Sequence, residues 1–182
     1  MQTRTLPTAI FALIFSAAAF LASPPPYAGQ QSREIKSMSM QEIGDYLAGK
    51  GMGLAKAAEL NGYPGPAHVL ELAEQLALTT EQRAQTETLF KDMQAKAIAA
   101  GMTLVEEEKA LDNLFATKNI SPATLQGALN LAAERQARVR FIHLDAHLAQ
   151  VTILSPRQIA LYNELRGYAD SAKQHVHQHA AH

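Results

Sequence analysis

Two histidines one helical turn apart are the residues of this sequence best suited to chemistry. His143 and His147 lie in a stretch with helical periodicity, so both side chains project from one side of a helix. Neutral imidazoles at this spacing can share one divalent ion such as Zn²⁺, Cu²⁺ or Ni²⁺. The alternative interpretation is structural, with one ring hydrogen-bonded in a helix seam and the other in solvent.

The helix that carries this pair is predicted to run from Pro122 to the break at Leu154. Its main apolar line recurs at steps of four and three, which is typical of a helix packed against another helix. That line consists of Leu125, Leu129, Ala132, Gln136, Val139, His143 and Ala146. A second apolar line, formed by Ala137, Phe141, Leu144, Leu148 and Val151, predicts that the buried face is broad.

A second long helix is predicted over about 79–115, where Thr79 and Gln82 fit an N-terminal cap. The short loop at 116–120 and the cap at Ser121 fold the two long helices back as an antiparallel hairpin. We therefore expect an all-α fold, with this hairpin flanked by shorter helices.

The hairpin predicts which residues face the histidines. For a turn centred near Lys118, His143 lies opposite about Gln94 and His147 opposite about Phe90. The nearest carboxylate on the facing helix is then Glu87. His68 and Glu71, on a short preceding helix, complete the predicted metal site if that helix folds over the open end of the hairpin.

The C-terminal tail holds a second group of histidines, His175, His177, His179 and His182. It has no apolar stripe, so we expect it to be disordered unless something binds it. One interpretation is a flexible polar tail, and the other is a weak, exchangeable metal scavenger.

Composition excludes several classes of function. The 182 residues carry a net charge of −1 with 18% charged residues, which argues against a nucleic-acid-binding protein. The sequence has no cysteine, so disulfides and thiolate ligands are excluded. It also lacks a phosphate-binding glycine loop, a nucleophile elbow and a His-Glu-x-x-His motif, so a non-enzymatic protein is predicted.

The N-terminus predicts export from the cytoplasm. A basic start, the apolar run 9–22 and small residues up to Ala28 are typical of a secretory signal, although a retained membrane anchor is the alternative. The predicted organisation is a signal peptide at 1–28, a linker and short helix at 29–62, a helical domain at 63–170 and the tail at 171–182. The segment Gln30 to Met38 is interpreted as a polar linker.

Two copies of a Leu-Thr/Ser-x-x-Gln motif flank the predicted hairpin, at Leu78 to Gln82 and Leu154 to Gln158. Together with the predicted signal peptide and the segments Tyr63 to Leu70 and Leu161 to Tyr168, these motifs resemble the Spy/CpxP periplasmic proteins and the related ZraP- and CnrX-type metal-responsive proteins. The resemblance covers about residues 64–168. By themselves the motifs act as helix caps.

The resemblance implies an all-helical, often dimeric and cradle-shaped protein of the bacterial envelope. Such proteins hold unfolded proteins during envelope stress, or bind divalent metal and report it to a regulatory partner. The CnrX-type pattern implies histidines from a first helix, a glutamate from a second and a His-x-x-x-His or His-x-x-x-Met pair from a third. Here the first helix offers only His68.

Three functions follow as hypotheses. The first is a periplasmic protein that senses or buffers a divalent heavy metal, with a homodimer as the expected assembly. The second is an ATP-independent refolding chaperone in which the histidines are incidental. The third is a membrane-anchored regulatory subunit of a signalling system.

Overall fold

The computed structural model describes residues 25–168, and within them all regular structure is helical, which confirms the all-α prediction. The helices are α1 (Met40–Leu47), α2 (Lys56–Glu59), α3 (Pro66–Glu71), α4 (Thr80–Ala116), α5 (Pro122–Ile153) and α6 (Pro156–Leu165). The chain divides into two units, 1–31 and 32–182, and every helix belongs to the second. The described part of the first unit, 25–31, consists of turns. The predicted signal segment and the tail histidines lie outside the described residues.

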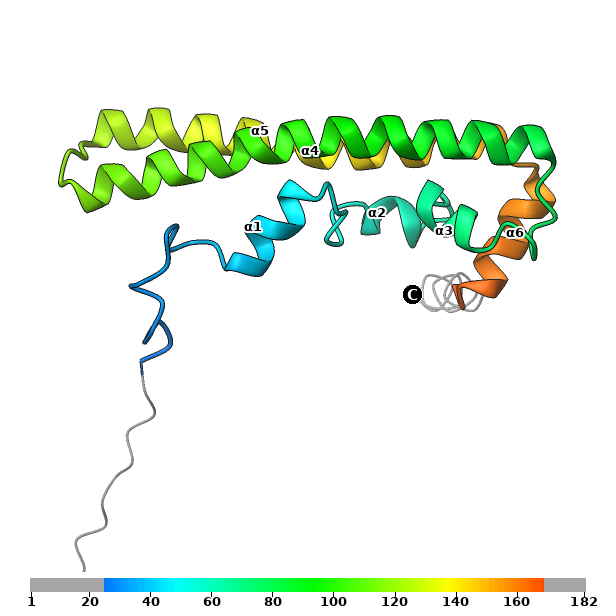
Figure 1. Cartoon of the computed structure of the whole chain (residues 1–182), viewed down its shortest axis with the longest axis horizontal. Coiled ribbons are helices and arrows are strands. Elements are labelled where there is room, and N and C mark those ends of the chain that lie inside the picture. Colours follow the sequence, from blue (N-terminus) through cyan, green and yellow to red (C-terminus); the bar gives the residue numbers. More distant parts are fainter. Residues whose placement is uncertain (1–24, 169–182) are drawn as a thin grey trace, which may run out of the picture. The chain divides into compact units, whose positions relative to one another are not determined.

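The two long helices α4 and α5 form the antiparallel hairpin of the second unit (Figure 1). Thr79 and Ser121 cap the two helices, because each side-chain oxygen accepts a hydrogen bond from the backbone N–H three residues later. Lys118 adopts a positive φ of 62° in the loop that reverses the chain. The predicted helix starts are thereby confirmed.

The register of the hairpin agrees with the register predicted from a turn near Lys118. Gln82 Nε2 donates to the carbonyl oxygen of Ile153, and Gln150 Nε2 donates to Thr86 Oγ1 one turn further along. Met93 and Ala97 pack against Ile142 and Ala146 in the middle of the hairpin. His143 and His147 therefore face the part of α4 around Gln94 and Phe90, as predicted.

Shorter segments cover one side of the hairpin (Figure 1). Near the middle, α1 lies so close to α4 that a Cβ atom at Gly101 would be 2.4 Å from the carbonyl oxygen of Tyr46. At the open end, a separate apolar cluster joins the segment around α3 to α6. It consists of Val69, Leu76, Leu154 and Tyr162, with partly buried neighbours.

The polar linker predicted over Gln30 to Met38 needs correction. Ile35 is only 1% exposed and Met38 is buried, and both belong to a cluster with Tyr46, Leu104 and Val139. Their isolated apolar side chains carry no periodic signal, but they fill the groove between α1 and the hairpin. The segment from Ser32 onward is therefore part of the same unit as the hairpin.

The broad buried face predicted for α5 also needs correction. Phe141 is 53% exposed and Leu148 is 56% exposed, and near the loop Leu129 is exposed as well. Residues two apart on a helix point in nearly opposite directions. The neighbouring elements cover Val139, His143 and Ala146, so Phe141 and Leu148 on the second line are largely exposed, while Leu144 and Val151 on that line are partly buried.

Within residues 25–168, none of the helices combines the length and the apolar composition needed to cross a lipid bilayer.

Candidate functional site

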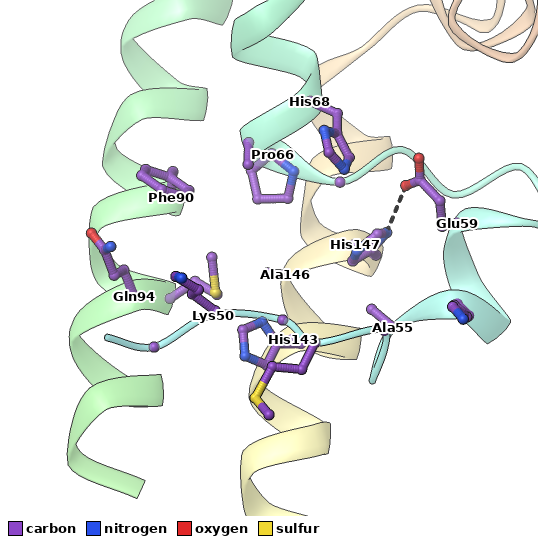
Figure 2. A pocket seen from close by; sticks show the side chains of 18 of the residues that line it. Lys50, Ala55, Glu59, Pro66, His68, Phe90, Gln94, His143, Ala146 and His147 are labelled. Carbon is purple, nitrogen blue, oxygen red and sulfur yellow. Dashed lines mark ion pairs between the residues drawn. The ribbon is translucent and has the colours of Figure 1, made fainter. Parts of the chain in front are cut away.

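A cavity of about 540 Å³ lies between the hairpin and the segment that contains α2 and α3 (Figure 2). One wall comes from α4 through Phe90, Met93 and Gln94. The facing wall comes from α5 through His143 and His147, and residues 48–68 form most of the cover. Its volume is in the range typical of small-ligand sites.

His147 is held in one orientation by the backbone of the covering segment. Its Nδ1 lies 2.7 Å from the carbonyl oxygen of Tyr63, and because a carbonyl only accepts, Nδ1 carries the proton. The lone pair of the neutral ring is then on Nε2. Gly65 packs against this edge, where a Cβ atom would be 2.8 Å from Cε1 and 3.0 Å from Nε2. Only glycine fits at position 65, because the Cβ atom of any other residue would clash with the His147 ring.

His143 lies deeper and has a polar atom without a partner. The residue is 6% exposed, and its Nε2 is buried and makes no hydrogen bond. Burial, with the neighbouring His147 as a smaller contribution, holds the pKa of His143 below its usual value. The ring is therefore neutral near pH 7, which is the protonation state that binds metal.

His68 brings a third imidazole to the cavity from α3 (Figure 2). Its Nδ1 lies 2.9 Å from Glu71 Oε2, a carboxylate oxygen that accepts a hydrogen bond from the ring and leaves the Nε2 lone pair available. His68 is partly exposed and Glu71 is exposed. The structure thus places Glu71 as the residue that orients His68, outside the cavity wall.

Glu87, predicted as the nearest carboxylate, has an exposed side chain and does not line the cavity. The carboxylate that does line it is Glu59 of α2, which the sequence interpretation missed. Glu59 Oε1 accepts a 2.6 Å hydrogen bond from the buried Tyr162 hydroxyl, and Oε2 lies 3.8 Å from His147 Nδ1. No spacing or motif in the segment before Pro64 could have indicated this role, because it depends on residues about 90 and 100 positions later.

Glu59 also joins the cavity to α6. Arg166 Nε lies 3.4 Å from Glu59 Oε1, and Tyr162 is completely buried beneath it. Burial and the hydrogen bond to Glu59 raise the pKa of the Tyr162 hydroxyl far above its usual value, so it stays protonated and remains a donor. One carboxylate therefore contacts side chains of both α5 and α6.

The donors of the cavity fit a borderline divalent cation by type. Three histidines line one space, and two of them have Nδ1 occupied by a backbone carbonyl or a carboxylate, which is the usual arrangement of metal-binding histidines. Among residues 25–168, no three histidine, aspartate or glutamate side chains already form a group that could hold a metal ion.

Comparisons with protein-family models, with curated proteins and with solved structures found no match to this chain.

Proposed function

We propose that this protein binds a divalent transition-metal ion, Zn²⁺, Cu²⁺ or Ni²⁺, in the cavity through His143 and His147, with His68 as a further ligand. The role is non-enzymatic: the protein senses or buffers the metal outside the cytoplasm. A bound ion would supply a positive centre that ties the imidazole of α3 to those of α5. The N-terminal signal pattern and the resemblance to the Spy/CpxP proteins support a location in the periplasm.

The observation that carries the proposal is the fixed tautomer of His147. Its Nδ1 donates to a backbone carbonyl, so the lone pair is on Nε2, in a ring that lines the cavity. The buried, unpartnered Nε2 of neutral His143 one turn away supplies a second nitrogen that the protein itself does not satisfy.

The test is calorimetric titration with ZnCl₂ of the chain in which His175, His177, His179 and His182 are replaced by alanine. Removing these tail histidines separates the cavity from the scavenger interpretation of the tail. We expect one Zn²⁺ per chain, and a large loss of affinity in His147→Ala and in His143→Ala. Undiminished binding in the His147→Ala variant would refute the proposed site. The matched control is Gln94→Ala, a cavity residue without an imidazole.

The second candidate function is an ATP-independent chaperone, and the exposed apolar line of α5 favours it. Phe141 and Leu148 are more than half exposed, and Arg138 lies over the Phe141 ring at 5.5 Å. Such a mixed apolar and basic surface suits an unfolded client. Suppression of client aggregation in the presence of a metal chelator, lost in Phe141→Glu, would support this function.

The same line also supports the expected homodimer. Ala137, Phe141, Leu144, Leu148 and Val151 repeat at steps of four and three, as in a seam between two helices. In an antiparallel pair centred between Phe141 and Leu144, Arg140 of one copy faces Asp145 of the other, a pairing of opposite charges. Sedimentation equilibrium of the parent and of Leu148→Glu tests this: a monomeric parent would leave the surface free for clients.

A further inference from the structure

The Glu59 carboxylate is a buried charge that the fold satisfies only in part. Its Oε1 accepts the Tyr162 hydroxyl at 2.6 Å and lies 3.4 Å from Arg166 Nε. Its Oε2 is buried and makes no hydrogen bond. An ionised carboxylate with an unpaired buried oxygen is costly, so this arrangement requires an explanation beyond the packing of α2.

The N–H edge of the His147 ring lies beside this oxygen. Glu59 Oε2 and His147 Nδ1 are 3.8 Å apart, and Figure 2 marks this ion pair. At that distance no hydrogen bond forms, because the Nδ1 proton is donated to the carbonyl oxygen of Tyr63. Both side chains are only 11% exposed, so a positive charge on the ring would interact with this carboxylate with little screening by water.

A neutral imidazole gains little from this neighbour, whereas an imidazole bound to a cation gains more. A metal ion on Nε2 withdraws electron density from the ring and makes the opposite N–H group more positive. In the carboxylate–histidine–metal arrangements of other proteins a carboxylate accepts that N–H group; here the Tyr63 carbonyl accepts it, and the carboxylate beside it would stabilise the metal-bound form through space. Glu59 is placed to act in this way, whereas Glu71 serves His68 at the exposed side of the cavity.

We propose that Glu59 is a positioning residue for the metal site, which favours the metal-bound form of His147 through the ring and couples that form to α6 through Tyr162 and Arg166. This inference rests on the proposed metal-binding function and deepens it. It assigns Glu59 no direct bond to the metal. The element that responds when the cavity is filled is α6, because Tyr162 of α6 and Arg166 directly after it both contact the same carboxylate.

The experiment compares Zn²⁺ affinity in a double-mutant cycle of Glu59→Gln and His147→Ala, in the chain without tail histidines. Glutamine keeps an acceptor for Tyr162 but removes the charge. We expect Glu59→Gln to lower the affinity by about 10- to 100-fold when His147 is present. It should change the affinity by less than twofold when His147 is alanine. Glu87→Gln, an exposed carboxylate outside the cavity, is the matched control and should leave the affinity unchanged.

A spectroscopic readout separates electrostatic positioning from a role in folding. The ¹⁵N resonances of the His147 ring should shift in Glu59→Gln without metal, while those of His68 stay in place. Tyr162→Phe serves as the second variant, because it removes a donor to Glu59 and keeps the charge. We expect it to retain zinc affinity within about threefold, whereas a carboxylate that acts only by holding the fold would lose affinity in both variants.

The outcomes are distinguishable. If the parent chain binds no zinc, the proposed function fails and this role fails with it. If the parent binds zinc and Glu59→Gln binds it within threefold, the site stands and the role of Glu59 is refuted. Equal losses in the presence and absence of His147 would also refute it. Hydrogen exchange of α6 that slows on zinc addition in the parent, but not in Glu59→Gln, would support the coupling, and exchange unchanged in both would refute that part.

Discussion

Gly101 lies where α1 approaches α4 most closely, and replacing it with alanine tests this contact. The added Cβ atom would be 2.4 Å from the carbonyl oxygen of Tyr46 and 2.9 Å from its carbonyl carbon. Both are backbone atoms, which cannot rotate aside as the tip of a side chain can. The residues of α1 must therefore move away from α4, and the covering segment that follows α1 forms part of the cavity wall.

Two effects of opposite sign determine how Gly101→Ala changes the free energy of unfolding. Alanine is favoured over glycine in a helix interior by about 1 kcal/mol. Overpacking a tight contact costs about 1–3 kcal/mol, and an approach of 2.4 Å to backbone belongs in the upper part of that range. The net result for Gly101→Ala is a loss of about 1–2 kcal/mol in the free energy of unfolding.

Gly127 of α5 is the matched control, because a Cβ atom there has no neighbour within 4 Å. Gly127→Ala keeps only the helix-propensity effect and should gain about 1 kcal/mol. Urea unfolding followed by far-UV circular dichroism measures both. With a slope near 2 kcal/mol per molar, the two midpoints should differ by about 1 M or more. Equal stabilisation by the two substitutions would show that α1 does not dock on Gly101.

Three further predictions concern the cavity and the buried polar residues. Gly65→Ala places a methyl group 2.8 Å from His147 Cε1 and should lower zinc affinity by about 10-fold or more, measured by calorimetry. Its φ of −87° suits alanine, but the His147 ring is buried and held by Tyr63, so the clash should also cost about 1–3 kcal/mol in urea unfolding. Thr86→Val leaves the buried Gln150 Nε2 without its acceptor and should cost about 1–3 kcal/mol in urea unfolding, whereas the double variant with Gln150→Leu should recover most of that loss. Because burial lowers the pKa of folded His143, the unfolded chain takes up this proton first as the pH falls. The stability contributed by neutral His143 is therefore fully present above about pH 6.5 and is lost below it. His143→Gln should show a smaller drop in unfolding free energy than the parent between about pH 8 and pH 5.5. An equal drop in the two proteins would contradict this assignment.

The ends of the long helices were predictable because their signals are local. The caps at Thr79 and Ser121 act within three residues of themselves, and the short loop between α4 and α5 forces a reversal. Once the turn was placed near Lys118, the register followed from helix geometry alone. The position of His143 and His147 opposite Gln94 and Phe90 could therefore be derived before any coordinates.

The burial of α5 could be predicted only in part. An apolar line shows that a face can be covered, and it does not show which partner covers it. The line through Val139 and Ala146 packs against α4, while Phe141 and Leu148 on the second line stay more than half exposed. Both lines repeat at steps of four and three, so only the positions of the neighbouring helices decide which line is buried.

The sequence alone determined the two long helices, their caps, the hairpin and the common direction of His143 and His147, since each depends on residues within a few turns of one another. Only the tertiary structure decided that Ile35 and Met38 are core residues, that Tyr63 fixes the tautomer of His147, and that Glu59 is the carboxylate of the cavity. These contacts join residues about 70 to 100 positions apart. No local pattern encodes such a pairing, because it arises from how the segment before α4 packs against the finished hairpin.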